Sequence, residues 1–224
     1  MPSLSADHPA RSDCEQVRPR IGQPVNTLTS IGIAAVGVRL ARRSRKDRHA
    51  HPGARWAGWA LAAAGLGSAV YHGPGGRVAP WLHDITLLAP PVVLALASEH
   101  ERRDASEVAL VPAIGAALAG AGVVRALAPK SQDSLSALTA VAVMAATWQR
   151  VRADHTPHDW PALAAAAATG AAGLGVHALS RTDGPLCRPD SVLQGHGLWH
   201  LLAAAATVIA SKGFGFHQDS WALT

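Results

Sequence analysis

Aromatic residues are scarce in this sequence, at only 4% of its 224 residues. Alanine, leucine and valine therefore carry most of the apolar content, which amounts to 49% of the chain. The first twenty-five residues lack the apolar core of a signal peptide, so no cleaved export signal is expected. Cysteine is rarer still, with only Cys14 and Cys187 present, and in a cytosolic protein these would be two ordinary thiols. The length suits one domain rather than two.

Long apolar runs are the dominant feature of what is present. Several approach the ~20 residues that a helix needs to cross a ~30 Å hydrocarbon layer, although the first and fifth are shorter. Apolar residues surround each run on all sides, which indicates burial in lipid or in a large core. The seven runs are Asn26–Leu40, Trp56–His72, Trp81–Ser98, Val108–Leu127, Ser134–Trp148, Trp160–Ser180 and Val192–Ser211.

These runs predict an all-α fold, a polytopic membrane protein in which residues 26–212 form a bundle of seven transmembrane helices. Residues 1–25 would form an N-terminal segment and residues 213–224 a tail. The alternative is an alanine-rich soluble helical bundle. Glycine and proline inside the runs favour the membrane interpretation, because small residues let membrane helices pack closely.

The distribution of cations predicts the orientation. If seven helices alternate, the basic segment "RLARRSRKDRHAHPGAR" lies on the same side as "EHERRD", "QRVRADHTPHDW" and the tail. Together with Lys212, which directly precedes the tail, those four regions hold twelve of the twenty Lys and Arg residues, so they should face the cytoplasm and leave the N-terminus extracytoplasmic. The expected location is the cell membrane, where the basic segment would attract anionic lipid head groups. No recognised nucleic-acid-binding fold accompanies the charge, so no nucleic-acid partner is expected.

This orientation changes the interpretation of the two cysteines. Cys14 falls in the N-terminal segment and Cys187 between the sixth and seventh runs, so both lie on the extracytoplasmic side. An oxidising compartment permits a disulfide between them, which would tie the N-terminal segment to the mouth of the bundle. Two unpaired thiols remain the alternative.

Histidines near the ends of two runs are candidates for metal ligands. His196 and His200 are four residues apart, so one helical face presents both imidazoles. Such a pair can also be solvated or serve in packing, but an ionisable side chain in an apolar span is costly and usually functional. Ser68 and His72 show the same spacing at the end of the second run, and Asp84 lies about one turn inside the third.

The predicted topology places all five residues at one face of the membrane. The second run ends at the outer face, and the third and seventh runs begin there. Three neutral histidines with a fourth position for water are the arrangement of an open catalytic zinc site.

The same residues resemble the alkaline ceramidases, which belong to a superfamily of seven-helix zinc hydrolases that also contains the progestin and adiponectin receptors. The resemblance rests on the Ser-x3-His, the Asp and the His-x3-His described above. It extends to "DCE" at 13–15, "NTLTS" at 26–30 and "PLCRPDSVLQGHGLWHLLAA" around the last run.

The resemblance implies a zinc-dependent amidase that hydrolyses the N-acyl bond of ceramide or a ceramide-like membrane lipid. It implies that His72, His196 and His200 bind one zinc ion, that Ser68 and Asp84 are the catalytic pair, and that Cys14 and Cys187 form a disulfide. Two other functions remain open. One is a lipid-responsive receptor of the adiponectin-receptor type with little turnover, and the other is a structural or transport bundle whose histidines only hold a metal.

The sequence departs from the family pattern in two places. Eukaryotic alkaline ceramidases bind calcium through an acidic N-terminal segment, whereas here only Asp13 and Glu15 are present and Gln23 stands where a carboxylate would be expected. Two carboxylates are too few for the oxygen cage that calcium prefers, so a calcium site is doubtful. His83, next to Asp84, has no counterpart and is expected to face elsewhere, because adjacent helical residues point about 100° apart.

Overall fold

The computed structural model describes residues 8–47, 50–153 and 158–216. Within these ranges the chain is all-helical, with no β-strand. A 3-10 helix, η1 (Pro9–Asp13), precedes seven α-helices. They are α1 (Pro24–Lys46), α2 (Pro52–His72), α3 (Ala79–Arg102), α4 (Glu107–Leu127), α5 (Gln132–Arg152), α6 (Trp160–Leu179) and α7 (Gly195–Gly213).

Seven predicted apolar runs thus correspond to seven helices, and the all-α prediction is confirmed. Four of them, α1, α3, α4 and α6, are long and apolar enough to cross a membrane. At 1.5 Å per residue, helices of 20 to 24 residues measure roughly 30–36 Å, which matches a hydrocarbon layer. Helix α1 begins at Pro24, so it includes the last two residues of the predicted N-terminal segment 1–25, and residues 217–224 of the predicted tail lie outside the described ranges.

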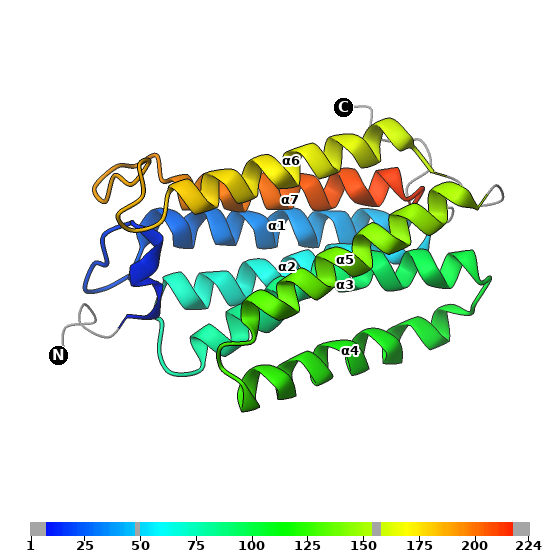
Figure 1. Ribbon diagram of the computed structural model, residues 1–224, viewed down its shortest axis with the longest axis horizontal. Helices are drawn as coiled ribbons and strands as arrows, with labels where there is room; N and C mark the ends of the chain where they lie inside the picture. Colours follow the sequence, from blue (N-terminus) through cyan, green and yellow to red (C-terminus); the bar gives the residue numbers. More distant parts are fainter. Residues whose placement is uncertain (1–7, 48–49, 154–157, 217–224) are drawn as a thin grey trace.

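The helices run up and down along a common direction, so the bundle has two distinct ends (Figure 1). One end, which we call the cap end, carries η1, the start of α1 and the C-terminal ends of α2, α4 and α6. The opposite end carries the C-terminal ends of α1, α3, α5 and α7. Residues far apart in sequence therefore meet at the cap end, where α2 finishes and α7 starts.

Helix α2 lies inside the bundle, in contact with α1, α3 and α7. Small residues allow α1 and α2 to approach closely. A Cβ atom added at Gly58 would overlap the backbone of Ala41, and one added at Gly65 would overlap the backbone of Ala34. This close contact fixes the position of the C-terminal end of α2, which carries Ser68 and His72.

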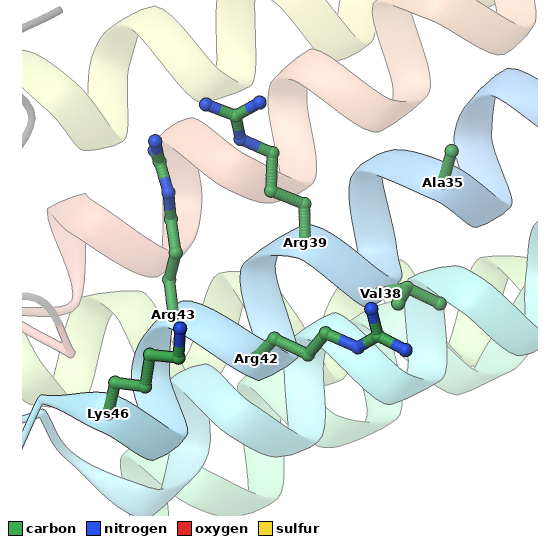
Figure 2. A pocket seen from close by; sticks show the side chains of 6 residues that line it. All are labelled: Ala35, Val38, Arg39, Arg42, Arg43 and Lys46. Atoms are coloured by element: carbon green, nitrogen blue, oxygen red, sulfur yellow. The ribbon is translucent and has the colours of Figure 1, made fainter. Parts of the chain in front are cut away.

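A basic cavity of about 500 Å³ lies along the C-terminal half of α1, toward the opposite end (Figure 2). Its lining includes Arg39, Arg42, Arg43 and Lys46, which recur at the i, i+3, i+4, i+7 spacing of one helical face. Cations here also suit the C-terminal end of the α1 dipole. The cap end and the opposite end therefore differ in chemistry as well as in the elements they contain.

Candidate metal centre

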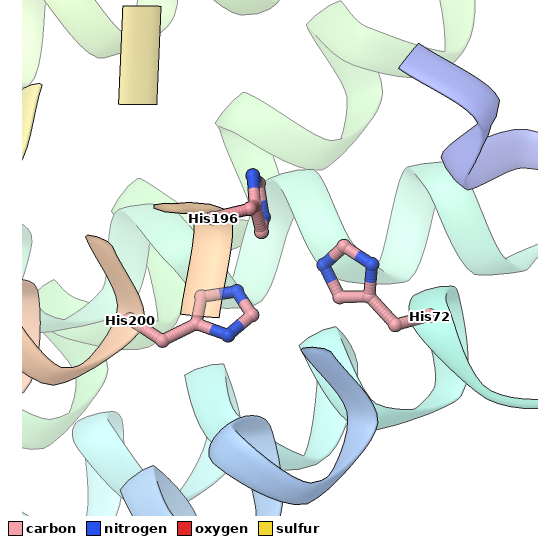
Figure 3. A group of neighbouring side chains, drawn as sticks. All are labelled: His72, His196 and His200. Carbon is pink, nitrogen blue, oxygen red and sulfur yellow. The ribbon is translucent and has the colours of Figure 1, made fainter. Parts of the chain in front are cut away.

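Three histidines meet at the cap end. His72 comes from the last turn of α2, while His196 and His200 come from the first two turns of α7. One nitrogen of each ring lies within 4.8 Å of the others, and the rings point toward one another (Figure 3). All three side chains are buried, with His72 completely inaccessible to solvent. The structure thus brings together the three residues that the sequence singled out as metal ligands.

The His72 ring has one partnered nitrogen and one without a partner. Its Nδ1 lies 2.7 Å from Oε1 of Gln23, the residue that caps the start of α1. Its Nε2 is buried and has no hydrogen-bond partner among the described residues. A buried nitrogen without a hydrogen-bond partner lowers the stability of the folded protein, so we expect this atom to bind a ligand.

The His196 ring follows the same pattern. Its Nδ1 lies 3.2 Å from Nδ1 of His177 in α6 and 3.6 Å from a carboxylate oxygen of Asp13 in η1. Its Nε2 is buried and, among the described residues, has no partner. Burial raises the pKa of the Asp13 carboxyl to about 6, even though the charge of Arg181 acts to lower it.

The His200 ring is held from α1. Its Nδ1 lies 2.9 Å from the hydroxyl of Thr29, which already donates its own hydrogen to the carbonyl of Val25. The Thr29 oxygen must therefore accept from Nδ1–H, which leaves Nε2 of His200 as the nitrogen with a free lone pair. That Nε2 lies 3.2 Å from the hydroxyl of Ser68.

All three rings thus engage a protein group through Nδ1 and turn Nε2 toward a shared space. Metal-binding histidines in proteins show this arrangement, because a partner on the outer nitrogen fixes the tautomer and the orientation of the ring. Three buried neutral imidazoles form a donor set that suits zinc. The residues present therefore fit a single metal ion.

Ser68, the first of the two predicted catalytic residues, lies inside this cluster. It is buried, and its hydroxyl lies 2.9 Å from the hydroxyl of Ser30 while facing Nε2 of His200. Ser30 donates its one hydrogen to the carbonyl of Asn26 at 2.6 Å, so the Ser68 hydroxyl can donate either to Ser30 or toward the space beside His200.

Asp84, the second predicted catalytic residue, contacts His83 and Arg125, and among the described residues it makes no hydrogen bond to the three histidines. One carboxylate oxygen accepts a 2.6 Å hydrogen bond from Nε of Arg125 in α4, and the other lies 3.2 Å from Nδ1 of His83. His83 in turn stacks on Tyr71 with 4.5 Å between ring centroids, and its ring centroid lies 6.2 Å from that of His72. His83 was predicted to face away from the site, but its ring lies beside that of His72. It does not belong to the group of three candidate metal ligands.

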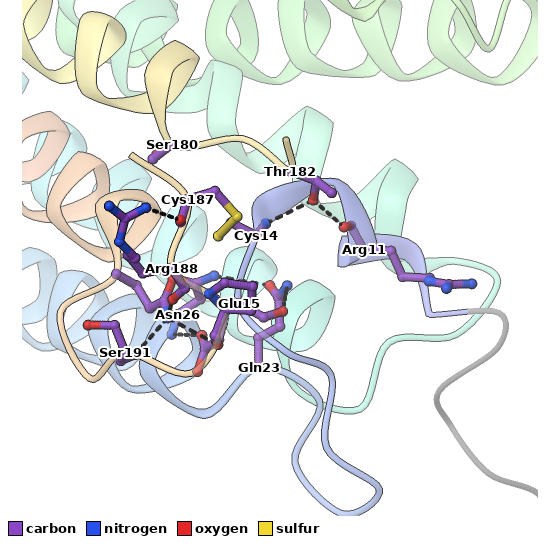
Figure 4. Close-up of a disulfide and its surroundings, with 12 residues drawn as sticks. Arg11, Cys14, Glu15, Gln23, Asn26, Ser180, Thr182, Cys187, Arg188 and Ser191 are labelled. Carbon is purple, nitrogen blue, oxygen red and sulfur yellow. Dashed lines mark hydrogen bonds between the residues drawn. A yellow bond between two sulfur atoms is a disulfide. The ribbon is translucent and has the colours of Figure 1, made fainter. Parts of the chain in front are cut away.

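The structure joins Cys14 and Cys187 in a disulfide at the cap end, with 5.6 Å between their Cα atoms (Figure 4). Thr182 reinforces this connection, because it accepts from the Cys14 backbone N–H and donates to the carbonyl of Arg11. Glu15 faces the start of α1, where its two carboxylate oxygens accept from the backbone N–H groups of Val25 and Asn26. Burial raises the pKa of the Glu15 carboxyl.

Sequence reasoning did not assign a role at the histidine cluster to four residues that contact it or Asp84. Thr29 and Asp13 fall inside the family-like segments, so the resemblance could have drawn attention to them. Gln23 was noted only because it stands where a calcium-binding carboxylate would be expected. Arg125 could have been singled out from the sequence, because an arginine inside an apolar run is costly unless it has a charged or polar partner.

Comparison of the sequence with family models and with curated proteins finds no match. The function of this chain is therefore best argued from the arrangement of residues at the histidine cluster.

Proposed function

We propose that this protein is an integral-membrane, zinc-dependent amidase that hydrolyses the N-acyl bond of ceramide or a ceramide-like lipid. The observation that carries the proposal is the buried cluster of His72, His196 and His200, in which the Nε2 atoms of His72 and His196 have no partner among the described residues. Three protein ligands leave one coordination position open, as in catalytic zinc sites. The apolar exterior of the helices around the cluster supports a lipid as the substrate.

A zinc ion held there would polarise a carbonyl oxygen and lower the pKa of a water molecule toward ~7. The protein supplies the remaining functions. The hydroxyl of Ser68, beside His200, can donate a hydrogen bond to the oxygen of the substrate carbonyl as negative charge develops on it. The carboxylate of Asp84 can accept a proton from the attacking water and return it to the nitrogen of the leaving amine. Arg125 holds that carboxylate from the side of α4.

An N-acyl lipid suits the surroundings of the cluster. An apolar cavity of about 440 Å³ lies between α3 and α4, and its lining includes Trp81 and Ile85, which bracket Asp84 in sequence. An acyl chain could enter such a site from the bilayer without crossing water, and the products would be a fatty acid and a sphingoid-type amine. The likeness of the ligand-bearing segments to the alkaline ceramidases supports this substrate class.

The proposal includes a membrane arrangement. All seven α-helices cross the bilayer of the cell membrane, and the cap end is extracytoplasmic. The greater number of cations on the opposite side supports this orientation, and so does the disulfide at the cap end, because disulfides persist in oxidising compartments.

Purified protein incubated with a panel of N-acyl lipids tests the proposed reaction. We expect fatty-acid release by the wild type and a loss of at least a hundredfold in kcat for His196→Ala and for Asp84→Ala. His158→Ala, which removes an exposed histidine near the opposite end, is the matched control and should retain activity. Stoichiometric zinc without cleavage of any acyl amide or ester would contradict the enzymatic proposal, and lipid binding without turnover would favour the receptor function.

A further inference from the structure

Residues 8–23 form a cap that is fastened to the bundle on two sides. On one side, Nε2 of His8 lies 3.1 Å from the carbonyl of Gly73, and the Tyr71 hydroxyl donates to the carbonyl of Pro9. On the other side, the backbone of Gln16 donates to the carbonyl of Pro189, beside the Cys14–Cys187 disulfide. The cap therefore connects the end of α2 to the segment that leads into α7, and these are the two elements that carry the histidine ligands.

Gln23, the last residue of this cap, has its amide orientation fixed by its neighbours. The amide nitrogen donates to two backbone carbonyls of the cap, those of Ala10 at 2.8 Å and Glu15 at 2.7 Å. A carbonyl oxygen cannot donate, so only the NH2 group of Gln23 satisfies both positions. The Oε1 atom must then face the opposite way, toward Nδ1 of His72 at 2.7 Å, where it also accepts from the side chain of Asn26.

This orientation determines the protonation of His72. Oε1 of Gln23 can only accept, so Nδ1 of His72 must carry the hydrogen and Nε2 must carry the lone pair. Nε2 is the buried nitrogen without a partner that faces His196 and His200. Gln23 is itself completely buried, so water does not compete for its amide.

We propose that Gln23 is a positioning residue for the metal, and that the cap acts through it by holding His72 in the one tautomer that can bind zinc. The proposal rests on the proposed function only in that it takes the three histidines as zinc ligands. It requires no particular substrate. Partners on the outer nitrogen of a ligand histidine typically contribute 10- to 100-fold to metal affinity, which sets the expected size of the effect.

Two substitutions separate the contact with His72 from the contacts within the cap. Gln23→Met keeps the length of the side chain and removes every hydrogen bond. Gln23→Glu keeps an oxygen facing Nδ1 of His72 and gives up a donor to the cap carbonyls. We expect zinc affinity, measured by competition with a chromophoric chelator on stripped protein in detergent, to fall 10- to 100-fold in Gln23→Met and to stay within about threefold of wild type in Gln23→Glu.

Gln194 provides a matched control. It is a second buried glutamine, it stands at the N-cap of α7 as Gln23 stands at that of α1, and its amide also donates to backbone carbonyls, here those of residues 188, 189 and 191. It makes no contact with a ligand ring among the described residues. Gln194→Met should lower thermal stability about as much as Gln23→Met does, while zinc affinity stays within about threefold of wild type.

Zinc binding and lipid hydrolysis are measured separately, so the two proposals can fail independently. Equal losses of zinc affinity in the two Gln23 variants, or wild-type affinity in Gln23→Met, would overturn the positioning role whatever the activity. If Gln23→Met does not fold, Gln23→Glu decides alone, because a loss of tenfold or more in its zinc affinity would overturn the proposal. A wild type whose zinc affinity depends on Gln23 but which cleaves no lipid would preserve this inference and remove only the proposed function.

Discussion

A buried imidazole has two nitrogen atoms to satisfy, and the three histidines at the cap end solve this requirement in the same way. Each Nδ1 has a partner from a different part of the chain. The partner of His72 is Gln23, and the partner of His200 is Thr29. His196 has two partners, Asp13 and His177. An unpaired buried nitrogen costs about 1–3 kcal/mol, so two such atoms are a substantial penalty unless an ion takes them up. The proposed chemistry would thus depend on residues that do not themselves bind the metal.

Arg125 offers a test at the same scale. Its Nε–H donates to Asp84 at 2.6 Å, and both side chains are largely buried, so Arg125 should set the direction in which the carboxylate faces. We expect Arg125→Gln to lower kcat for lipid hydrolysis roughly tenfold or more, with zinc content unchanged, because misplacing a catalytic group by about 1 Å can cost up to a hundredfold. Arg125→Lys should restore little, since an ammonium group does not reproduce the geometry of Nε–H.

Arg77→Gln is the control for this prediction. Arg77 is an exposed arginine near the cap end, between α2 and α3, so its removal changes the net charge equally and leaves Asp84 untouched. Steady-state kinetics of the purified variants provide the measurement. Unchanged kcat in Arg125→Gln would show that Asp84 needs no support from α4.

At this scale, the sequence predicted the ligands better than their partners. His196 and His200 could be paired because helical spacing alone brings them to one face, and the topology then added His72. Gln23 could not be identified, because a glutamine has no distinctive pattern and its role depends on carbonyls 8 and 13 residues away, in the short segment that folds over the end of the bundle. The orientation of His83 was not anticipated, since the 100° rule ignores Tyr71, on which its ring stacks.

At the scale of helices, the apolar runs predicted all seven described α-helices but not their ends, and they did not predict η1. The first run stops at Leu40, whereas α1 continues to Lys46, because arginine and lysine are good helix formers although they are not apolar. Conversely, the last run begins at Val192, but α7 begins at Gly195, and Val192 and Leu193 are among the most exposed large hydrophobic residues described, at 80% and 86%. Hydropathy predicts burial in an apolar phase, and helix continuity is a separate property.

The contact between α1 and α2 leads to a prediction at this scale. A Cβ at Gly65 would overlap the backbone of Ala34 and lie 2.7 Å from the carbonyl oxygen of Ser30, and neither backbone group can rotate away. Gly65→Ala should therefore force the helices apart and destabilise the protein by about 1–3 kcal/mol. Because Ser30 and Ser68 lie on the two helices being separated, zinc affinity should fall as well.

Gly120→Ala in α4 is the matched control. A Cβ there meets nothing within 4 Å, and alanine favours a helix by up to about 1 kcal/mol over glycine. Thermal unfolding in detergent, followed by circular dichroism, compares the two variants. A melting temperature for Gly65→Ala equal to that of Gly120→Ala would contradict the tight contact between α1 and α2.

At the scale of the whole molecule, the two ends of the bundle suit different chemical surroundings. The disulfide at the cap end links residues 173 positions apart and is stable only where the compartment is oxidising. The opposite end bears the basic cavity of α1, whose four cations suit the anionic head groups of a cytoplasmic leaflet. Disulfide chemistry and charge are independent properties, and both support the proposed orientation with the cap end outside.

Two exposed aspartates allow this orientation to be tested with matched variants. Asp183 lies between α6 and α7 at the cap end, and Asp104 lies between α3 and α4 at the opposite end. Both have positive φ, 67° and 51°, so a cysteine at either position meets a similar backbone strain. Cys14 and Cys187 are joined in the disulfide, so the introduced cysteine carries the thiol that reacts with a maleimide. A membrane-impermeant maleimide added to intact cells should label Asp183→Cys, and Asp104→Cys only after the membrane is permeabilised. The reverse result would place the disulfide and the histidine cluster on the reducing side, where neither the covalent link of the cap nor access to outer-leaflet lipid could be maintained.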